Sequence, residues 1–141
     1  MEKCANPIPM SDAIGFDNDG TPHLVGQRCS HCGKVMPGRR LACANCFRAD
    51  GLESADLGTD GMIFAWTIVH RSFPGVPVPI ISAAVRLSSG AHVLGNVEGL
   101  SPDPKAVADC PGVQVDFATL DAPDGSKLIR YFFKPLTGDA A

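Results

Sequence analysis

Residues 29–46 read CSHCGKVMPGRRLACANC, and this stretch holds two Cys-x-x-Cys pairs separated by ten residues. A Cys-x-x-Cys pair closes a tight turn in which both sulfurs face one point, and two such turns supply the four tetrahedral thiolates that zinc prefers. The spacer is long enough for a small hairpin that brings the pairs together, with Arg39 and Arg40 at its tip. The sequence therefore predicts one structural zinc ion, with no open coordination position, bound by Cys29, Cys32, Cys43 and Cys46.

Other uses of the paired cysteines are less favoured. A rubredoxin iron site also uses four cysteines, but its spacer is much longer. A redox role for either Cys-x-x-Cys pair lacks the surrounding βαβ pattern. His31 lies between the first two cysteines, and we expect it to be an exposed loop residue rather than a ligand.

The composition predicts a globular protein made of short strands and turns. Of the 141 residues, 45% are hydrophobic and 19% are charged, and Gly (15) and Pro (12) are abundant. The net charge of −3 gives no overall attraction to nucleic acid or anionic lipid. The N-terminus shows no signal-peptide pattern, and no stretch approaches the roughly 20 apolar residues of a membrane span. We therefore expect a cytoplasmic protein with reduced cysteines.

The second half of the chain has the pattern of a small barrel. Residues 50–61 are polar and Gly-rich, and we interpret them as a connector. Residues 101–109 predict one or two turns of helix. Five strands with a helix between the third and fourth fit the five-stranded Greek-key OB-fold barrel. The predicted strands are residues 62–70, 79–87, 91–97, 113–120 and 127–134.

The predicted organisation is a lead-in at 1–20, a zinc ribbon at 21–50 and a barrel at 61–135. Ser11 or Asp12 could cap a short helix within the lead-in.

These motifs together resemble a known family. Its members join an N-terminal rubredoxin-like zinc ribbon to a C-terminal OB-fold and accompany thiolase-like enzymes that act on acyl-CoA. The resemblance covers roughly residues 21–135. It is carried by residues 27–33 (QRCSHCG), Pro37, Arg40, residues 43–46 (CANC), 61–71 (GMIFAWTIVHR), 94–97 (LGNV) and 132–135 (FFKP).

The resemblance implies a non-catalytic subunit of a heteromeric thiolase-type enzyme. The partner would carry the nucleophilic cysteine, and this chain would assist assembly and binding of the CoA thioester. A two-plus-two assembly is expected because thiolases are two-fold dimers. Degradation of aromatic acids or of steroid side chains is among the family's roles, and the sequence does not choose between them. We predict no catalytic residue, no nucleic-acid partner and no membrane partner.

Positive charge is concentrated around the cysteines. Residues 21–49 hold five basic residues and no acid. The fork of guanidinium donors suits the phosphates of CoA or an acidic patch on the partner, and a solvated basic turn is the plain alternative. The residues predicted to bind CoA or the partner in this way are Arg28, Lys34, Arg39 and Arg40.

Phe73 lies in the Pro-rich loop at 71–79, and we predict that it is an apolar anchor for the partner or a ligand. An ordinary long hairpin loop is the alternative. Three prolines would keep this loop ordered at low entropic cost.

Other functions remain open. Zinc ribbons and OB-folds also bind single-stranded nucleic acid, but residues 50–141 carry six basic residues against eleven acids, which opposes phosphate binding. A stand-alone enzyme would need a nucleophile with a base. The leftover cysteines, Cys4 and Cys110, have no recognisable base motif and are expected to be inert thiols.

Overall fold

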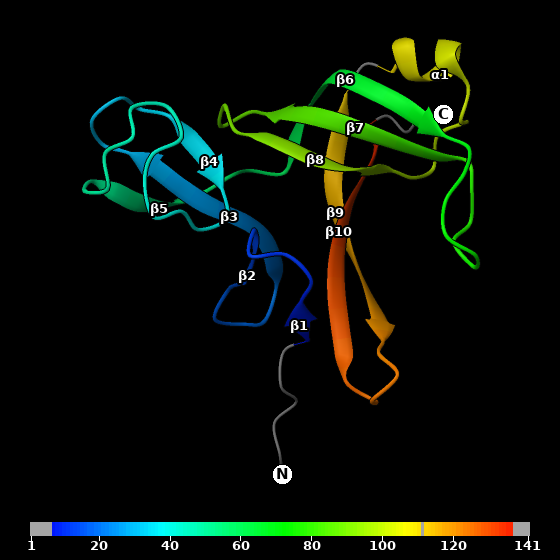
Figure 1. Ribbon diagram of the computed structural model, residues 1–141, viewed down its shortest axis with the longest axis horizontal. Helices are drawn as coiled ribbons and strands as arrows, with labels where there is room; N and C mark the ends of the chain where they lie inside the picture. The colour runs from blue at the N-terminus through cyan, green and yellow to red at the C-terminus, as the bar shows by residue number, and fades with distance from the viewer. Residues whose placement is uncertain (1–6, 111, 137–141) are drawn as a thin grey trace. The chain divides into compact units, whose positions relative to one another are not determined.

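The computed structural model describes residues 7–110 and 112–136, and these residues form mainly β-strands (Figure 1). They divide into two compact units, and strands β9 (Val113–Asp121) and β10 (Lys127–Pro135) contribute to both. The first unit contains the described residues up to Gly58 and Phe117–Tyr131, and the second contains Thr59–Asp116 and the described residues from Phe132 onward.

One strand organises the cysteine-bearing sheet of the first unit. β3 (Pro22–Cys29) is antiparallel to β2 (Ile14–Phe16), β4 (Val35–Pro37) and β5 (Leu52–Asp56). Residues Gly26–Arg28 pair with β4 and with β5, so β3 lies between these two strands (Figure 1). The cysteine-bearing turns are therefore attached to a hydrogen-bonded sheet.

The close approach of β3 and β4 depends on Gly26. A Cβ atom added at Gly26 would overlap the carbonyl oxygen of Met36, so no larger residue fits without moving a strand. Leu24 and Leu57 are fully buried, and Met36 is almost so. The sequence thus places a glycine where two backbones touch and large apolar residues where the ribbon needs a core.

The predicted connector at 50–61 is wrong in part, because it contains β5. Five of its residues pair with β3, from Leu52 opposite Cys29 to Asp56 opposite Val25. The segment is polar because most of its side chains are not buried, and only Leu57 after it is fully buried. Backbone pairing rather than apolar patterning defines this strand, which explains why its composition indicates a linker.

The short helix considered at Ser11 or Asp12 is absent from the described lead-in. The Ser11 hydroxyl accepts a hydrogen bond from the Ala13 amide (3.1 Å), and the Ile14 amide donates to the Ser11 carbonyl (3.2 Å). This turn leads directly into β2. Strand β1 (Ile8–Pro9) precedes it and pairs in parallel with Leu128 and Ile129 of β10.

The second half of the chain forms the predicted five-stranded closed barrel. β6 (Asp60–Val69), β7 (Ile80–Leu87) and β8 (His92–Val97) form an antiparallel meander. β8 pairs in parallel with β10, β10 pairs with β9, and β9 pairs with β6, which closes the barrel. The mainly β fold class, with an N-terminal ribbon and an OB-fold barrel, is confirmed.

Alternation along the strands explains the barrel core. Every second residue of β7 is buried, from Ile81 to Leu87. Phe133 of β10 is fully buried and lies opposite Val97 of β8. Apolar residues at a period of two therefore fill one face of the sheet, as the sequence predicts.

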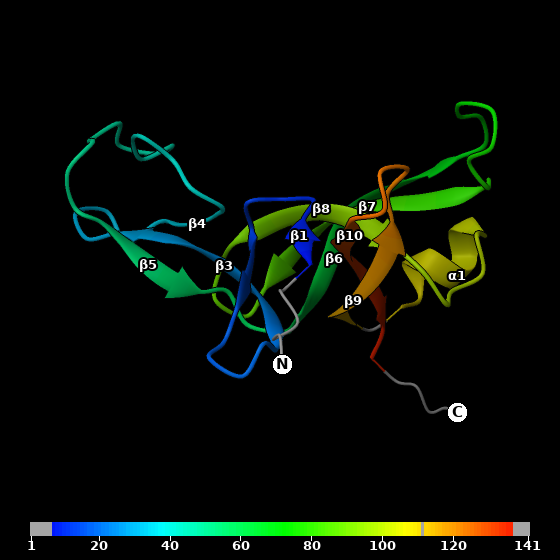
Figure 2. The ribbon, with the colours of Figure 1, turned by 90° about the horizontal axis from the view of Figure 1, so that it is seen from below.

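The predicted helix also forms, as α1 (Pro104–Ala108). The Asp103 carboxylate caps it by accepting a hydrogen bond from the Ala106 amide (3.2 Å), and Pro104 occupies its first turn. The Pro-rich loop at 70–79 projects from the end of the β6–β7 pair (Figures 1 and 2). In the part of the chain that the structure describes, no helix is long and apolar enough to span a membrane.

Candidate metal centre

Two backbone turns of the same design carry the four cysteines. In the first turn the Cys29 amide donates to the Lys34 carbonyl (2.9 Å), and the Gly33 amide donates to the Cys29 carbonyl (2.8 Å). In the second turn Cys43 bonds to Arg48 in the same way (2.9 Å), and the residue after Cys46 bonds back to Cys43 (3.0 Å). Each Cys-x-x-Cys pair thus closes a tight turn, as the spacing predicts.

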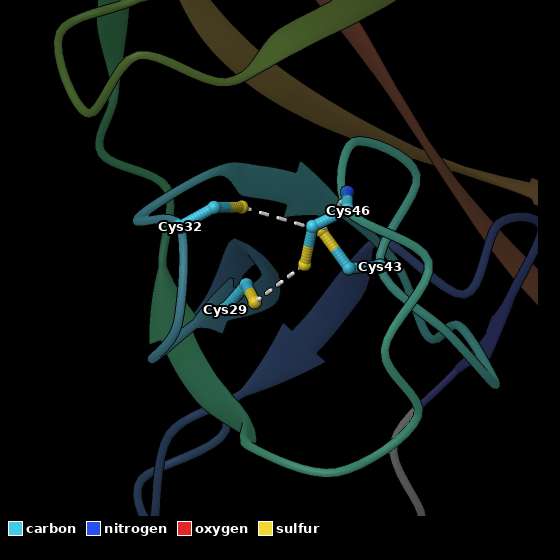
Figure 3. Close-up of side chains that lie close together, drawn as sticks. All are labelled: Cys29, Cys32, Cys43 and Cys46. Carbon is cyan, nitrogen blue, oxygen red and sulfur yellow. Dashed lines mark hydrogen bonds between the residues drawn. The ribbon is translucent and has the colours of Figure 1, made fainter.

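The sulfur atoms have the geometry of a tetrahedral metal site. All four sulfurs lie within 4.8 Å of one another and are turned toward one point (Figure 3). The Sγ atoms of Cys29 and Cys46 are 3.7 Å apart, and those of Cys32 and Cys43 are 3.5 Å apart. Tetrahedral zinc–thiolate bonds of about 2.3 Å place two sulfurs about 3.8 Å apart. The observed spacing therefore fits one zinc ion with four thiolates.

Burial differs among the four cysteines. Cys29 and Cys43 are almost fully buried and pack with Met36 in the small core of the ribbon. Cys46 is half-buried and Cys32 is exposed. A metal bound here would be held against the sheet on one side and would be close to water on the side of Cys32.

Hydrogen-bond donors favour the charged form of two thiols. The pKa of Cys32 is lowered to about 6, first by a hydrogen bond with the Asn45 side chain and next by the Lys34 backbone amide. The pKa of Cys43 is also lowered, chiefly by the Cys46 backbone amide. Such donors stabilise a thiolate and prepare both sulfurs to bind a cation.

The pKa of Cys46 moves in the opposite direction. The backbone amide of Arg48 is its strongest partner and favours the thiolate, but burial and the neighbouring thiols, with Cys29 first among them, raise this pKa to about 11. Thiolates at this spacing repel one another when no cation lies between them. Zinc binding would remove that repulsion and release the remaining protons, so binding becomes weaker at low pH.

The donor set identifies the chemistry of the site. Four sulfur ligands supplied by the protein occupy every position of a tetrahedral zinc ion and leave none for a substrate or water. Such a zinc ion stabilises the ribbon and performs no reaction itself. His31 takes no part in the site: it is exposed, and its Nε2 lies 3.4 Å from Asp50 Oδ2.

Two further cysteines remain, and the structure describes one of them. The Cys110 thiol donates a hydrogen bond to the Gly112 carbonyl (3.3 Å), an environment that does not activate a nucleophile. Cys4 lies outside the described residues.

The basic residues do not all lie where the predicted hairpin would place them. β4 folds back on β3, so the turn of this hairpin is the first cysteine turn itself, and Arg28 and Lys34 flank it. Arg39 and Arg40 lie after β4, in the loop that leads to the second pair. The hairpin-tip position predicted for these two arginines is therefore wrong, because only three spacer residues form a strand and they pair with β3.

The loop fixes the backbone of both arginines. The Arg39 amide donates to the Asp12 carboxylate (3.1 Å), and the Arg40 amide donates to the Gln27 side-chain oxygen (2.7 Å). Neither guanidinium forms an ion pair within the described residues. The backbone of both residues is thus held in place, and the two guanidinium groups remain available for a ligand.

A cavity of about 530 Å³ lies beside this loop in the first unit. Arg39 and His23 line it, but so do the carboxylates of Asp12 and Asp56. Two acids beside one arginine make the cavity unsuited to a phosphate group.

Phe73 lies in the second unit, in the loop at 70–79, and 82% of its side chain is exposed. Its assignment as a binding residue stays a prediction, as do those of the four basic residues.

Sequence reasoning missed two exposed apolar side chains beside the second cysteine turn. Leu41 is 94% exposed and Phe47 is 78% exposed. Phe47 also has a positive φ of 67°, which a bulky residue rarely adopts. An alignment of the two turns, CSHCG and CANCF, indicates the positive φ of Phe47, because Phe47 stands where the first turn has Gly33.

Two family models match the chain. Residues 20–53 match the model described as ChsH2, rubredoxin-like zinc ribbon domain, and this range includes all four ligand cysteines. Residues 55–118 match the model described as ChsH2, C-terminal OB-fold domain.

Three curated proteins are similar in sequence. A DUF35 domain-containing scaffold protein of Methanothermobacter thermautotrophicus is 28% identical over 82% of this chain and 88% of its own length. A probable enoyl-CoA hydratase alpha subunit of Thermomonospora curvata is 29% identical over 68% of this chain and 30% of its own length. The benzoylsuccinyl-CoA thiolase subunit BbsA of Geobacter metallireducens is 29% identical over 57% of this chain and 53% of its own length.

A solved structure shares the fold. It is that of an Ltp2-ChsH2(DUF35) aldolase, with a TM-score of 0.55 and 24% sequence identity over 82% of this chain and 86% of the other.

Proposed function

Since this chain belongs to the family whose members join a ChsH2-type zinc ribbon to a ChsH2-type OB-fold domain, we propose that it is the non-catalytic subunit of a heteromeric thiolase-type enzyme. The chain assists assembly of the enzyme and binding of the acyl-CoA substrate, and a thiolase-like partner carries the nucleophile. The names of two relatives, a scaffold protein and a thiolase subunit, support this assignment.

The observation that carries the proposal is the closed metal site. All four ligand positions are filled by cysteine sulfur, so the zinc of this chain cannot activate water or polarise a carbonyl. The thiol of Cys110 bonds to a carbonyl rather than to a base. The reactive groups are therefore assigned to the partner.

The barrel offers a surface for such a partner. Met62, Phe64 and Leu94 are 61%, 55% and 73% exposed. Strand register places Met62 opposite Arg86 and Arg86 opposite His92, and the Phe64 ring lies 4.7 Å from that of His92. These side chains share the outward face of β6, β7 and β8. Large apolar residues rimmed by polar ones are typical of protein interfaces.

The acyl-CoA part of the proposal rests on the basic loop. Arg39 and Arg40 have fixed backbones and guanidinium groups without an ion pair in the described part of the chain. Charge-assisted bonds to CoA phosphates, or to acids of the partner near them, are their assigned role, and Arg28 and Lys34 contribute to the same field. Phe73 is assigned to an apolar contact of the complex.

The remaining parts of the proposal concern the stoichiometry, location, substrate and domain bounds. We assign a two-plus-two assembly, a cytoplasmic location and a substrate drawn from aromatic-acid or steroid degradation. The domains are taken as a ribbon at 21–50 and a barrel at 61–135.

Affinity purification of the tagged full-length chain from its native extract tests the proposal. A thiolase-like chain should be recovered in equal amount and identified by mass spectrometry. The recovered complex should turn over acyl-CoA substrates, and the purified chain alone should not. Turnover by the isolated chain that is lost on Cys110→Ala would refute the assignment.

Single-stranded nucleic acid is the second candidate ligand, because exposed aromatic residues occur on β6 and in the loop after it. The excess of acids in residues 50–141 opposes it. A gel shift of single-stranded DNA at low salt, caused by the zinc-loaded chain, would favour this candidate.

A further inference from the structure

The residue that follows each cysteine pair adopts a left-handed backbone conformation. Gly33 has a φ of 81° and Phe47 has a φ of 67°, and the amide of each donates to the carbonyl of the first cysteine of its turn. The turn therefore requires a positive φ at this position. Glycine meets the requirement without strain, whereas a side chain as large as phenylalanine meets it only at a cost in free energy.

The phenylalanine does not recover this cost within its own chain. Its side chain is 78% exposed, and that of Leu41 in the same loop is 94% exposed. The core of the ribbon is made instead by Cys29, Met36 and Cys43. Neither zinc binding nor ribbon packing requires an aromatic ring at position 47, and because the ring stays in water, its burial does little to offset the cost of the strained backbone.

The charges around these two apolar residues indicate what covers them. Arg39 and Arg40 precede Leu41, and neither has an ion pair within the described residues. Arg48 follows Phe47, and its Nε lies 3.4 Å from Asp50 Oδ1. Two exposed apolar residues whose neighbours in the chain are arginines are complementary to an apolar pocket with an acidic rim.

We propose that Phe47, together with Leu41, is an anchor that inserts into an apolar pocket with an acidic rim on a protein partner. The occupant rests on the proposed function, under which this partner is the thiolase-like subunit. The hydrogen-bonded turn fixes the direction of the Phe47 Cα–Cβ bond, which lowers the entropic cost of placing the side chain in a rigid pocket. A lipid bilayer is fluid and accepts a side chain from any direction, so a side chain held on a fixed and strained backbone favours a protein over a membrane.

Substitution separates the strain from the contact. Phe47→Gly should raise the melting temperature of the isolated zinc-loaded chain, keep one zinc per chain, and weaken binding to the recovered thiolase-like subunit at least tenfold. Phe47→Ala should weaken binding to the same extent, but it keeps a Cβ atom and should melt below Phe47→Gly. Met10→Ser is the matched control, because Met10 is 56% exposed in the same unit and lies outside the basic loop.

A photo-crosslinker identifies the occupant. Benzoylphenylalanine at position 47 of the full-length chain, irradiated in native extract, should crosslink to the thiolase-like chain, and the same group at position 10 should not. Unchanged affinity of Phe47→Gly, or recovery of the thiolase-like chain without a crosslink from position 47, overturns the anchor and leaves the proposed function standing.

Three further outcomes also overturn the anchor. One is failure of the wild-type chain to recover any thiolase-like protein, which defeats the proposed function as well. Another is Phe47-dependent binding to vesicles of equal phosphatidylcholine and phosphatidylserine or to single-stranded DNA. The last is a melting temperature of Phe47→Gly at or below that of Phe47→Ala, which contradicts the strain.

Discussion

Replacing two ligand cysteines that differ in burial tests the structure of the metal site. Cys29→Ser and Cys32→Ser each remove one of four thiolates, so both should lower zinc affinity. Because binding energy at a structural site of this kind is folding energy, about 10–16 kcal/mol in small zinc domains, both should also destabilise the ribbon. The two variants should nevertheless not be equivalent.

Burial gives the size of the difference. Cys29 is 0% exposed and packs in the ribbon core, whereas Cys32 is exposed. A serine hydroxyl placed in that core without a hydrogen-bond partner costs about 1–3 kcal/mol, and one placed in water costs almost nothing. For a chain of 141 residues this corresponds to a melting temperature about 3–12 °C lower for Cys29→Ser than for Cys32→Ser.

The assay combines metal analysis with thermal unfolding. Elemental analysis should find one zinc and little iron per wild-type chain, and melting curves should be recorded with and without chelator. Cys110→Ser is the control, because its thiol lies outside the site, and it should keep its zinc. Equal melting of the two ligand variants, or a wild-type curve unaffected by complete zinc removal, would show that the reasoning is wrong.

Three other predictions follow from the same structure. Acid should release zinc, because protons compete with zinc for the thiolates. In the zinc-free chain, the Cys32 thiolate stabilises the fold fully above its ordinary pKa of 9.0, and this stabilisation is lost as the pH falls through about 6; unfolding measured from pH 9 to pH 5 would show the loss. The double variant Arg39→Ala, Arg40→Ala should raise the KM of the recovered complex for acyl-CoA about tenfold or more, since one charge-assisted bond is worth about 1.5–3 kcal/mol. Dissociation of the complex at unchanged KM would assign both arginines to assembly, and no change in either would show that they form a solvated turn. Gly26→Ala should lower both the melting temperature and the zinc affinity, because its Cβ would overlap the Met36 carbonyl and push β3 from β4, and unchanged values for both would contradict that close approach.

Regular patterns are what the sequence reveals most directly. The period of two along β7 and the spacing of the cysteine pairs both follow from local geometry, and the structure agrees with each. The helix at 104–108 is also evident, because Asp103 and Pro104 form a recognisable start. In these cases the signal and the structure depend on neighbouring residues.

The features that were missed depend on distant residues or on backbone conformation. β5 is polar, and it is a strand only because β3 offers it a row of hydrogen-bonding groups. Arg39 and Arg40 leave the hairpin because β4 is three residues long. The strained backbone of Phe47 has no composition signal at all, and only comparison with Gly33 in the first turn points to it.

The pairing of β3 on both sides has a consequence for hydrogen exchange. Gly26–Arg28 face β4 and β5, so their amides can exchange with solvent only when the sheet itself separates. The same strand ends at the ligand Cys29. Exchange of these few amides should therefore report on occupancy of the metal site, slow when zinc is bound and fast when it is removed, while amides of the edge strands respond much less.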